Sequence, residues 1–308
     1  MRLKGLMQPL FENEQFKDVV KAVEDRRFPI EVVGLSDSGI GFFINGIYEN
    51  QDKSILIFTH SDVEAKNLYE DLSFYLPNVY YFPNKEVVFY NIYAISGDLR
   101  WERLKVIREM LREDKKIIVA SIENLVASYI SPELYRKYTI HISVGDTADM
   151  ESLSERLIQS GYERVSIVEG KGEFSIRGGI LDIYPPISSI PYRIEFFGDE
   201  VDSIRSFNTE SQRSIEKFNS IEIFPAKEMI LTKENVDKGY EEIKKDLELA
   251  KKTLGKDKEA RERIELSISA NLELLKENWG FENIDSFLPY FYDKTFTLTD
   301  YMKDCLIF

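Results

Sequence analysis

Two glycines, Gly34 and Gly39, have the spacing of a phosphate-binding loop of the form G-x4-G-K-[ST]. In such a loop the lysine reaches the terminal phosphates of a nucleotide, and the hydroxyl that follows holds a magnesium ion. The corresponding residues here are Ile40 and Gly41, which supply neither a cation nor an oxygen ligand. Asp37 would also place a negative charge inside the loop. The stretch therefore predicts the outline of a P-loop that does not turn over ATP. An ordinary strand-to-helix turn is the alternative, because two glycines five residues apart are common.

A second set of chemistry-bearing residues lies on an expected strand at 192–197. Alternation along a strand puts every second side chain on the same face. The core face is expected to take Tyr192, Ile194 and Phe196. The opposite face is expected to take Arg193, Glu195 and Phe197. Because arginine and aromatic side chains dominate the energetics of protein interfaces, this outer face is a candidate docking surface.

Arg177 ends another expected strand, 173–176, just before a Gly178-Gly179 turn, and we expect it near the same surface. Two alternatives stay open. In the first, Phe197 turns inward at the end of its strand and joins the core. In the second, either arginine only pairs with Glu173 or Glu195 at the surface, which contributes little stability. Further candidates rest on proximity in sequence alone: Asp182, Glu195 and Arg213.

Composition and charge narrow the functional classes. The chain has 308 residues and a formal net charge of −14, and acidic residues also outnumber basic ones between residues 146 and 228. This balance favours a protein partner over a nucleic-acid backbone, which is usually bound by a basic surface. One cysteine and two histidines argue against a disulfide or a structural zinc site and fit a reducing cytoplasm. No apolar run approaches the roughly 20 residues of a membrane helix, and no secretory signal is expected.

The elements that must position these residues change in character along the chain. Up to residue 145, short apolar runs alternate with amphipathic helices, which is typical of a parallel sheet with crossover helices. Strands are expected at 28–35, 54–59, 79–82 and 116–121. Helices are expected from residue 1 to about 29 and at 61–75, 98–112 and 123–129, with Ser61 or Asp62 as the N-cap of the second.

From residue 146 to 227 short strands with tight turns predict an antiparallel sheet. One helix is expected at 152–159, and strands at 165–168, 173–176, 180–184, 192–197, 201–207 and 221–224. Gly178-Gly179 and Gly198-Asp199 are hairpin signals. After residue 227 two long, charged helices are expected at 234–254 and 256–278, with solvated Lys/Glu faces. The apolar end, 305–308, predicts a buried strand and a natural protein that continues beyond it.

Three motifs in the middle block carry a family resemblance. They are residues 172–186 (GEFSIRGGILDIYPP), 191–205 (PYRIEFFGDEVDSIR) and 211–214 (SQRS). In this order and spacing they closely resemble the second domain of bacterial transcription-repair coupling factors (Mfd), and more distantly that of the excision-repair helicase UvrB. The resemblance extends over essentially the whole chain.

The resemblance implies an α/β fold, namely a degenerate RecA/P-loop-like parallel sheet with an inserted, mainly antiparallel α+β domain. Residues 1–145 resemble domain 1a with a vestigial P-loop, residues 146–227 the inserted domain 2, and residues 228–308 the returning domain 1b. The resemblance also implies a module that is not an enzyme and binds no cofactor, although the full-length family protein is an ATP-dependent DNA translocase.

The partner implied by the resemblance is UvrA, which the module recruits to stalled RNA polymerase. In the family, two arginines and a phenylalanine bind UvrA, and they match Arg177, Arg193 and Phe197 here. The full-length family protein also has RNA polymerase, DNA and its own carboxy-terminal domain as partners, and the last of these masks the UvrA-binding surface.

One departure separates the chain from UvrB, which clamps DNA with a long aromatic-rich hairpin. Here a short linker, 87–97, stands in that place, with Tyr90 and Tyr93 but no room for such a hairpin. The alternative function is a nucleotide-binding or DNA-binding UvrB-like module with residual activity. Against it, the nearest downstream lysines lie outside the loop (Lys53 and Lys85).

Overall fold

A parallel sheet of four strands organises the first part of the protein. The strand order is β12-β1-β3-β2, and every neighbouring pair in it is parallel. The strands are β1 (Ile55–Thr59), β2 (Val79–Phe82), β3 (Ile117–Ser121) and β12 (Leu306–Ile307). All five residues of the central β3 are buried, as expected for a parallel strand covered on both faces. The parallel sheet predicted for this region is confirmed.

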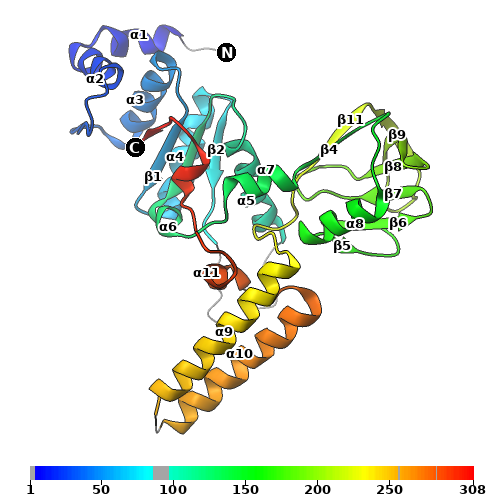
Figure 1. The fold of residues 1–308 in the computed structure, drawn as a ribbon. Helices are drawn as coiled ribbons and strands as arrows, with labels where there is room; N and C mark the ends of the chain where they lie inside the picture. Colours follow the sequence, from blue (N-terminus) through cyan, green and yellow to red (C-terminus); the bar gives the residue numbers. More distant parts are fainter. Residues whose placement is uncertain (1–3, 86–96, 256, 282) are drawn as a thin grey trace. The chain divides into compact units, whose positions relative to one another are not determined.

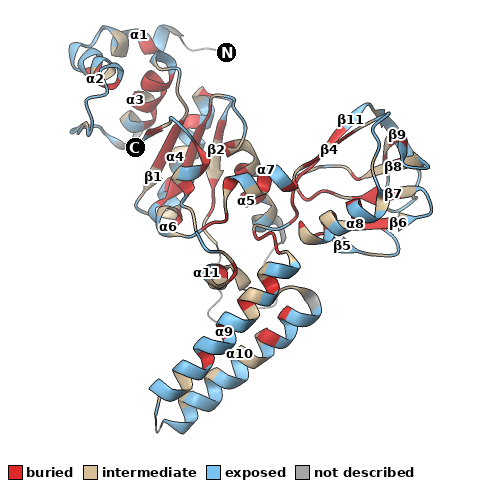
Figure 2. Ribbon diagram, viewed as in Figure 1, coloured by how far each residue is buried: buried red, intermediate tan, exposed pale blue. Residues whose placement is uncertain are grey.

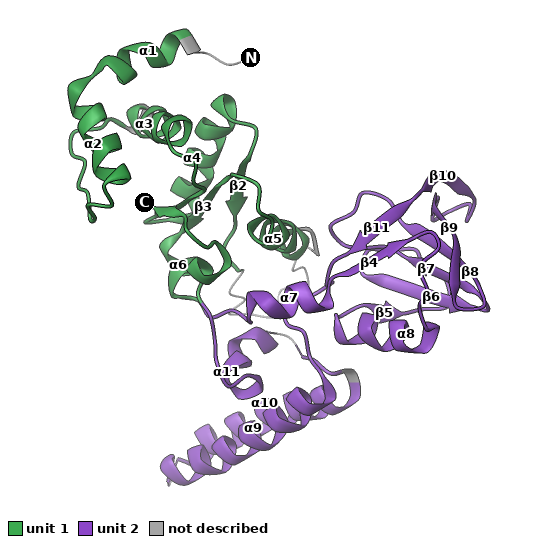
Figure 3. Cartoon of the chain, turned by 45° about the horizontal axis from the view of Figure 1, so that its top comes forward, with its two compact units in different colours: residues 1–127, 297–308 green, residues 128–296 purple. Residues whose placement is uncertain are grey.

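The computed structural model describes residues 4–85, 97–255, 257–281 and 283–308, without the side chains at 4, 37, 38, 97, 98 and 278. The chain forms two compact units (Figure 3). The first comprises residues 1–127 and 297–308, and the second residues 128–296. The finer division expected at residues 145 and 227 stays a prediction.

The first unit also contains six helices among its described residues (Figure 1). They are α1 (Lys4–Glu12), α2 (Glu14–Glu24), α3 (Asp37–Asn50), α4 (Asp62–Tyr75), α5 (Gly97–Met110) and α6 (Ile122–Val126). Of these, α4, α5 and α6 pack against the sheet, and α1 and α2 lie beside α3. Ser61 caps α4, as predicted, because its side chain accepts a hydrogen bond from the backbone N–H of Glu64. Helix α6 ends at Val126 rather than at residue 129, because Ala127 has already left the helical region for an extended conformation.

The strand predicted at 28–35 is absent from the structure. Residues 27–36 form no strand, and Val33 is 82% exposed. An apolar β-branched run favours an extended chain, but it becomes a strand only where a neighbouring strand offers its backbone groups. The edge strand β12 pairs with β1, and its Leu306 is buried while its Ile307 is exposed. The strand expected at the chain end is therefore confirmed only as this two-residue pairing with β1.

A six-stranded sheet forms most of the second unit's β-structure, in the order β10-β9-β8-β7-β6-β5. The strands are β5 (Glu163–Arg164), β6 (Glu173–Arg177), β7 (Ile180–Ile183), β8 (Tyr192–Phe197), β9 (Glu200–Phe207) and β10 (Ser214–Phe218). All pairs are antiparallel except β5 with β6. Gly178 and Gly198 have φ angles of 61° and 64° in the β6–β7 and β8–β9 turns. Both hairpin predictions are confirmed, since such angles favour glycine.

The core of this β-structure lies on one face of the sheet. Leu153 and Leu157 of α8 (Met150–Gln159) join a buried cluster with Phe174, Leu181 and Ile194. A separate two-stranded pairing joins β4 (Ile140–Ser143) to β11 (Ser220–Ile223) and adds to the same cluster. The other face of the six-stranded sheet carries Asp182 and Arg193, together with the buried ring of Phe207 against Arg193.

The strand predicted at 165–168 is wrong. The segment is a loop, and the only strand nearby is β5, one residue earlier. Val168 is nevertheless fully buried, and the carbonyl of Ser166 accepts a hydrogen bond from the Ser175 hydroxyl. The apolar pattern correctly indicated burial, but burial came from a loop folded over the sheet instead of strand pairing. Sequence reasoning also missed α7 (Pro132–Tyr138), β4 and β10.

Two long helices form a hairpin in the second unit, α9 (Lys233–Thr253) and α10 (Lys258–Asn278), as predicted. Gly255, with φ of 55°, lies in the turn between them. Their outward faces are largely exposed (Figure 2). Lys251 of α9, whose side chain is 18% exposed, pairs with Glu248 of its own helix and with Glu265 of α10. Within the described part of the chain, no helix combines the length and the apolar character needed to cross a membrane.

Candidate docking surface

The outer face of the six-stranded sheet holds the residues singled out on β6 and β8. Across the sheet, Ser175, Asp182, Arg193 and Arg205 stand in one row of directly paired positions. Directly paired residues point to the same side of a sheet. Because the neighbouring Leu181 and Ile194 are fully buried in the core on the other side, the row belongs to the outer face. The alternation predicted for β8 is confirmed.

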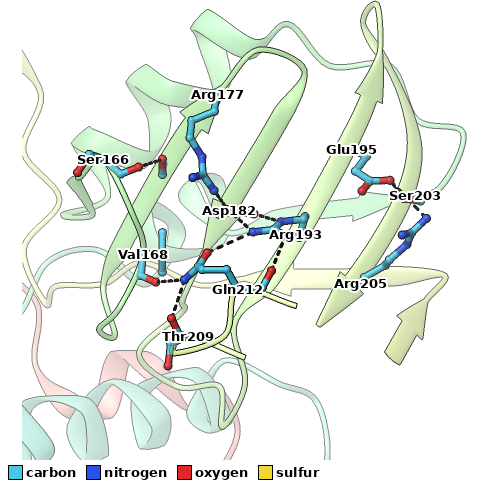
Figure 4. Close-up of polar contacts among 11 residues, drawn as sticks. Ser166, Val168, Arg177, Asp182, Arg193, Glu195, Ser203, Arg205, Thr209 and Gln212 are labelled. Carbon is cyan, nitrogen blue, oxygen red and sulfur yellow. Dashed lines mark hydrogen bonds and ion pairs between the residues drawn. The ribbon is translucent and has the colours of Figure 1, made fainter. Parts of the chain in front are cut away.

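Asp182 is the centre of this row. Its side chain is 1% exposed and accepts hydrogen bonds from both candidate arginines (Figure 4). Arg193 donates from Nε to Oδ1 at 2.6 Å and from Nη2 to Oδ2 at 2.8 Å, and Arg177 donates from Nη2 to Oδ2 at 2.7 Å. These hydrogen bonds to Asp182 hold the pKa of Arg193 above its usual value. The two arginines therefore meet at one buried carboxylate.

Gln212 completes the surroundings of Arg193. Its backbone carbonyl accepts from Arg193 Nη1 at 3.0 Å, and its side-chain Oε1 accepts from Nη2 at 3.3 Å. The Arg193 guanidinium also lies 4.8 Å from the centre of the Phe207 ring. Sequence reasoning missed the role of Gln212. The only signal available was its place in the SQRS motif, which says nothing of its distance from Arg193.

Phe197 stands at the end of β8, beside the β8–β9 turn, and is 85% exposed. The alternative in which its ring turns into the core is therefore wrong. Its neighbour Phe196, by contrast, packs against the buried cluster. The glutamate on the same face, Glu195, accepts a hydrogen bond from Ser203 at 2.7 Å and pairs with Arg205 at 3.4 Å. Neither Arg177 nor Arg193 pairs with Glu195 or Glu173 among the interactions of the described residues; both use Asp182 instead.

The glycine-bearing stretch at 34–41 does not form a loop around an anion. Helix α3 begins at Asp37, so Gly39, Ile40 and Gly41 lie within its first turns. The N–H groups of Gly39 and Ile40 donate to the carbonyl of Ser36, at 2.8 and 3.0 Å. A phosphate-binding loop leaves such N–H groups to point at the ligand. Only Gly34, with φ of 89°, precedes the helix in a left-handed conformation.

The side chain of Asp37 and the linker with Tyr90 and Tyr93 lie outside the described residues. Arg213 is exposed in the turn that contains Gln212. Among the described residues, no group of three or more His, Cys, Asp or Glu side chains is arranged to hold a metal ion.

Comparison with known proteins places the surface inside a recognised domain. The family model of the UvrB interaction domain matches residues 140–229, which include β6, β7, β8 and the Gln212 turn. The transcription-repair-coupling factor of Bacillus subtilis (strain 168) is 36% identical over 295 residues, covering 95% of this chain and 25% of the relative.

Two further relatives carry the same name. That of Staphylococcus epidermidis (strain ATCC 35984) is 30% identical over 284 residues, covering 89% of this chain and 23% of the relative. That of Staphylococcus haemolyticus (strain JCSC1435) is 29% identical over 282 residues, covering 90% and 24%. The chain thus spans about a quarter of the length of the curated relatives that it matches. The chain is a homologue of the amino-terminal, UvrB-like part of the bacterial transcription-repair-coupling factors, and it carries a UvrB interaction domain.

Proposed function

We propose that this chain is a docking module that recruits the excision-repair protein UvrA to stalled RNA polymerase in the bacterial cytoplasm. The observation that carries the proposal is an exposed phenylalanine, Phe197, at the same end of the sheet as the arginine pair on Asp182. An exposed aromatic ring beside arginine is the composition of an interface hot spot. The surface lies within the segment that matches the UvrB interaction domain.

In this proposal residues 146–227 bind UvrA, and binding depends on Arg177, Arg193 and Phe197. Residues 1–145 and 228–308 carry that domain as remnants of a RecA-like fold. RNA polymerase, DNA and a masking carboxy-terminal domain are partners of the longer protein, whose translocase activity this part does not perform.

The absence of catalysis is part of the proposal. A nucleotide would need a lysine at position 40 and free N–H groups ahead of the helix. Here position 40 is isoleucine, and the Gly39 and Ile40 N–H groups are used inside α3. This arrangement supports docking over nucleotide hydrolysis. The acidic net charge supports a protein partner over DNA.

The test is a calorimetric titration of the chain with purified UvrA. Binding is expected for the parent, and Arg177→Ala and Phe197→Ala are each expected to weaken it about tenfold or more, the effect of a hot-spot residue. Ile215→Ala is the matched control, because Ile215 is a 69% exposed apolar residue on β10, away from Arg177 and Phe197. A parent affinity weaker than about 100 μM would contradict the proposed function. Equal losses in all three variants would contradict the location of the surface.

A further inference from the structure

The two arginines on Asp182 differ in how much of each remains open to a partner. A guanidinium has five N–H donors. Arg193 uses four of them within its own domain, two on Asp182 and two on Gln212. Its side chain is 14% exposed. Arg177 donates from Nη2 to Asp182, and its side chain is 47% exposed. Arg193 therefore has little left to offer a partner, whereas Arg177 does.

Gln212 holds its position through an unusual backbone conformation. Its φ angle is 57°, in the left-handed region that residues other than glycine seldom adopt. Hydrogen bonds inside the turn maintain it, from Gln212 N to the Asn208 carbonyl at 2.8 Å and from Asn208 N to the Arg213 carbonyl at 3.0 Å. The side-chain nitrogen of Gln212, Nε2, also donates to the backbone carbonyls of Thr209 and Val168. The turn thus holds both oxygens of Gln212 toward Arg193.

The charges of this group leave one positive charge at the surface. Asp182 is buried, and a buried carboxylate needs a paired cation. Arg193 meets that need with two hydrogen bonds in the fork geometry that carboxylates accept from arginine. The charge of Arg177 is therefore not needed to neutralise the Asp182 carboxylate. Arg177 ends β6 and Phe197 ends β8, two strands away and about 10 Å across the sheet.

We propose that Asp182, Arg193 and Gln212 form a positioning unit that does not touch the partner and that orients Arg177 beside Phe197. Arg177 then binds a carboxylate of the partner, and the Phe197 ring enters an apolar pocket of the partner next to that carboxylate. This inference rests on the proposed function, because it divides the three matched residues into two that contact UvrA and one that positions them.

The first experiment examines the free chain. Nitrogen-15 spectra of arginine Nε–H groups are recorded at neutral pH, with the Arg193 signal assigned by its loss in Arg193→Lys. The Arg193 Nε–H is expected to exchange slowly with water, because it lies on a buried carboxylate. The protection is expected to vanish in Asp182→Asn. Exchange as fast as that of exposed arginines would overturn the positioning unit.

The second experiment measures UvrA affinity with a variant that changes no charge and no surface arginine. Gln212→Gly keeps the left-handed backbone, which glycine adopts readily, but removes the side chain that supports Arg193. We expect about three- to tenfold weaker binding, and we expect the double variant Gln212→Gly/Arg193→Lys to bind as Arg193→Lys does, because both changes damage one unit. Ser211→Ala, an exposed position in the same turn, is the control and should bind as the parent does.

The outcomes separate the two proposals. Affinity of Gln212→Gly within about 1.5-fold of the parent means that Arg193 acts without its support, and this overturns the inference while the docking function stands. The inference is also overturned if the double variant loses affinity by the product of the fold-losses of its two single variants. No binding by the parent chain overturns the docking function and the inference together. Circular dichroism of each variant is the control that tests whether the fold is intact.

Discussion

Truncation of Phe197 should separate binding from stability, because its ring contributes to the surface and not to the core. Phe197 is 85% exposed. A phenylalanine side chain has an area of about 200 Å², so roughly 30 Å² of it is buried here. At about 25 cal/mol per Å² of apolar area, Phe197→Ala removes less than about 1 kcal/mol of stability.

The adjacent Phe196 is the matched control, since it is the same residue type on the same strand. Phe196 is partly buried and packs against the core cluster that contains Ile194 and Val201. Full burial would make Phe→Ala cost about 3–5 kcal/mol, so a partly buried ring should cost about 2 kcal/mol. The two variants are therefore expected to affect different quantities. Phe196→Ala lowers stability, whereas Phe197→Ala lowers UvrA affinity by about tenfold or more.

Hydrogen exchange of β8 and β9 peptides in increasing urea is the suitable assay, because it reports the opening of this sheet and not of the whole chain. UvrA affinity is measured in parallel by calorimetry at 25 °C. If Phe197→Ala destabilised β8 as much as Phe196→Ala, the ring would have to be packed, and the assignment of faces along β8 would be refuted. Unchanged affinity of a stable Phe197→Ala would refute the hot spot.

Two further predictions concern the core and the degenerate loop. Burial raises the pKa of Tyr162 well above its usual value. The folded state therefore keeps a proton that the unfolded state releases above about pH 10, and the free energy of unfolding falls as pH rises from there. Tyr162→Phe loses the 2.6 Å hydrogen bond to the Phe224 carbonyl and is expected to cost about 1 kcal/mol at pH 7. It should also flatten the alkaline fall. Urea unfolding between pH 9 and 11.5 tests this, and an equal fall in the free energy of unfolding for parent and variant would contradict it. The double change Ile40→Lys/Gly41→Thr should not create ATP binding, because α3 already begins at Asp37, and a nucleotide-dependent rise in the melting temperature of this variant would show that the backbone reopens.

Much of the fold was available from local patterns. The strands β1, β2 and β3 are short apolar runs of the parallel sheet, with β3 buried along its whole length, and the two hairpins have glycine at the positions with positive φ. The failures share one cause. The segments 28–35 and 165–168 have the apolar pattern of strands, but a strand also needs a partner edge, and hydrophobic periodicity carries no information about partners.

For the docking surface, the sequence by itself determined the identity of the motifs, the loss of the phosphate-binding lysine at Ile40 and the face of β8 that carries Arg193 and Phe197. These follow from residue type and from the two-residue period of a strand. Only the tertiary structure decided that Asp182 joins two arginines and that Gln212 encloses one of them. Those contacts depend on strand register and on the path of a turn 19 residues from Arg193. Local propensity does not encode such distances, because they are fixed when separate strands and loops pack together.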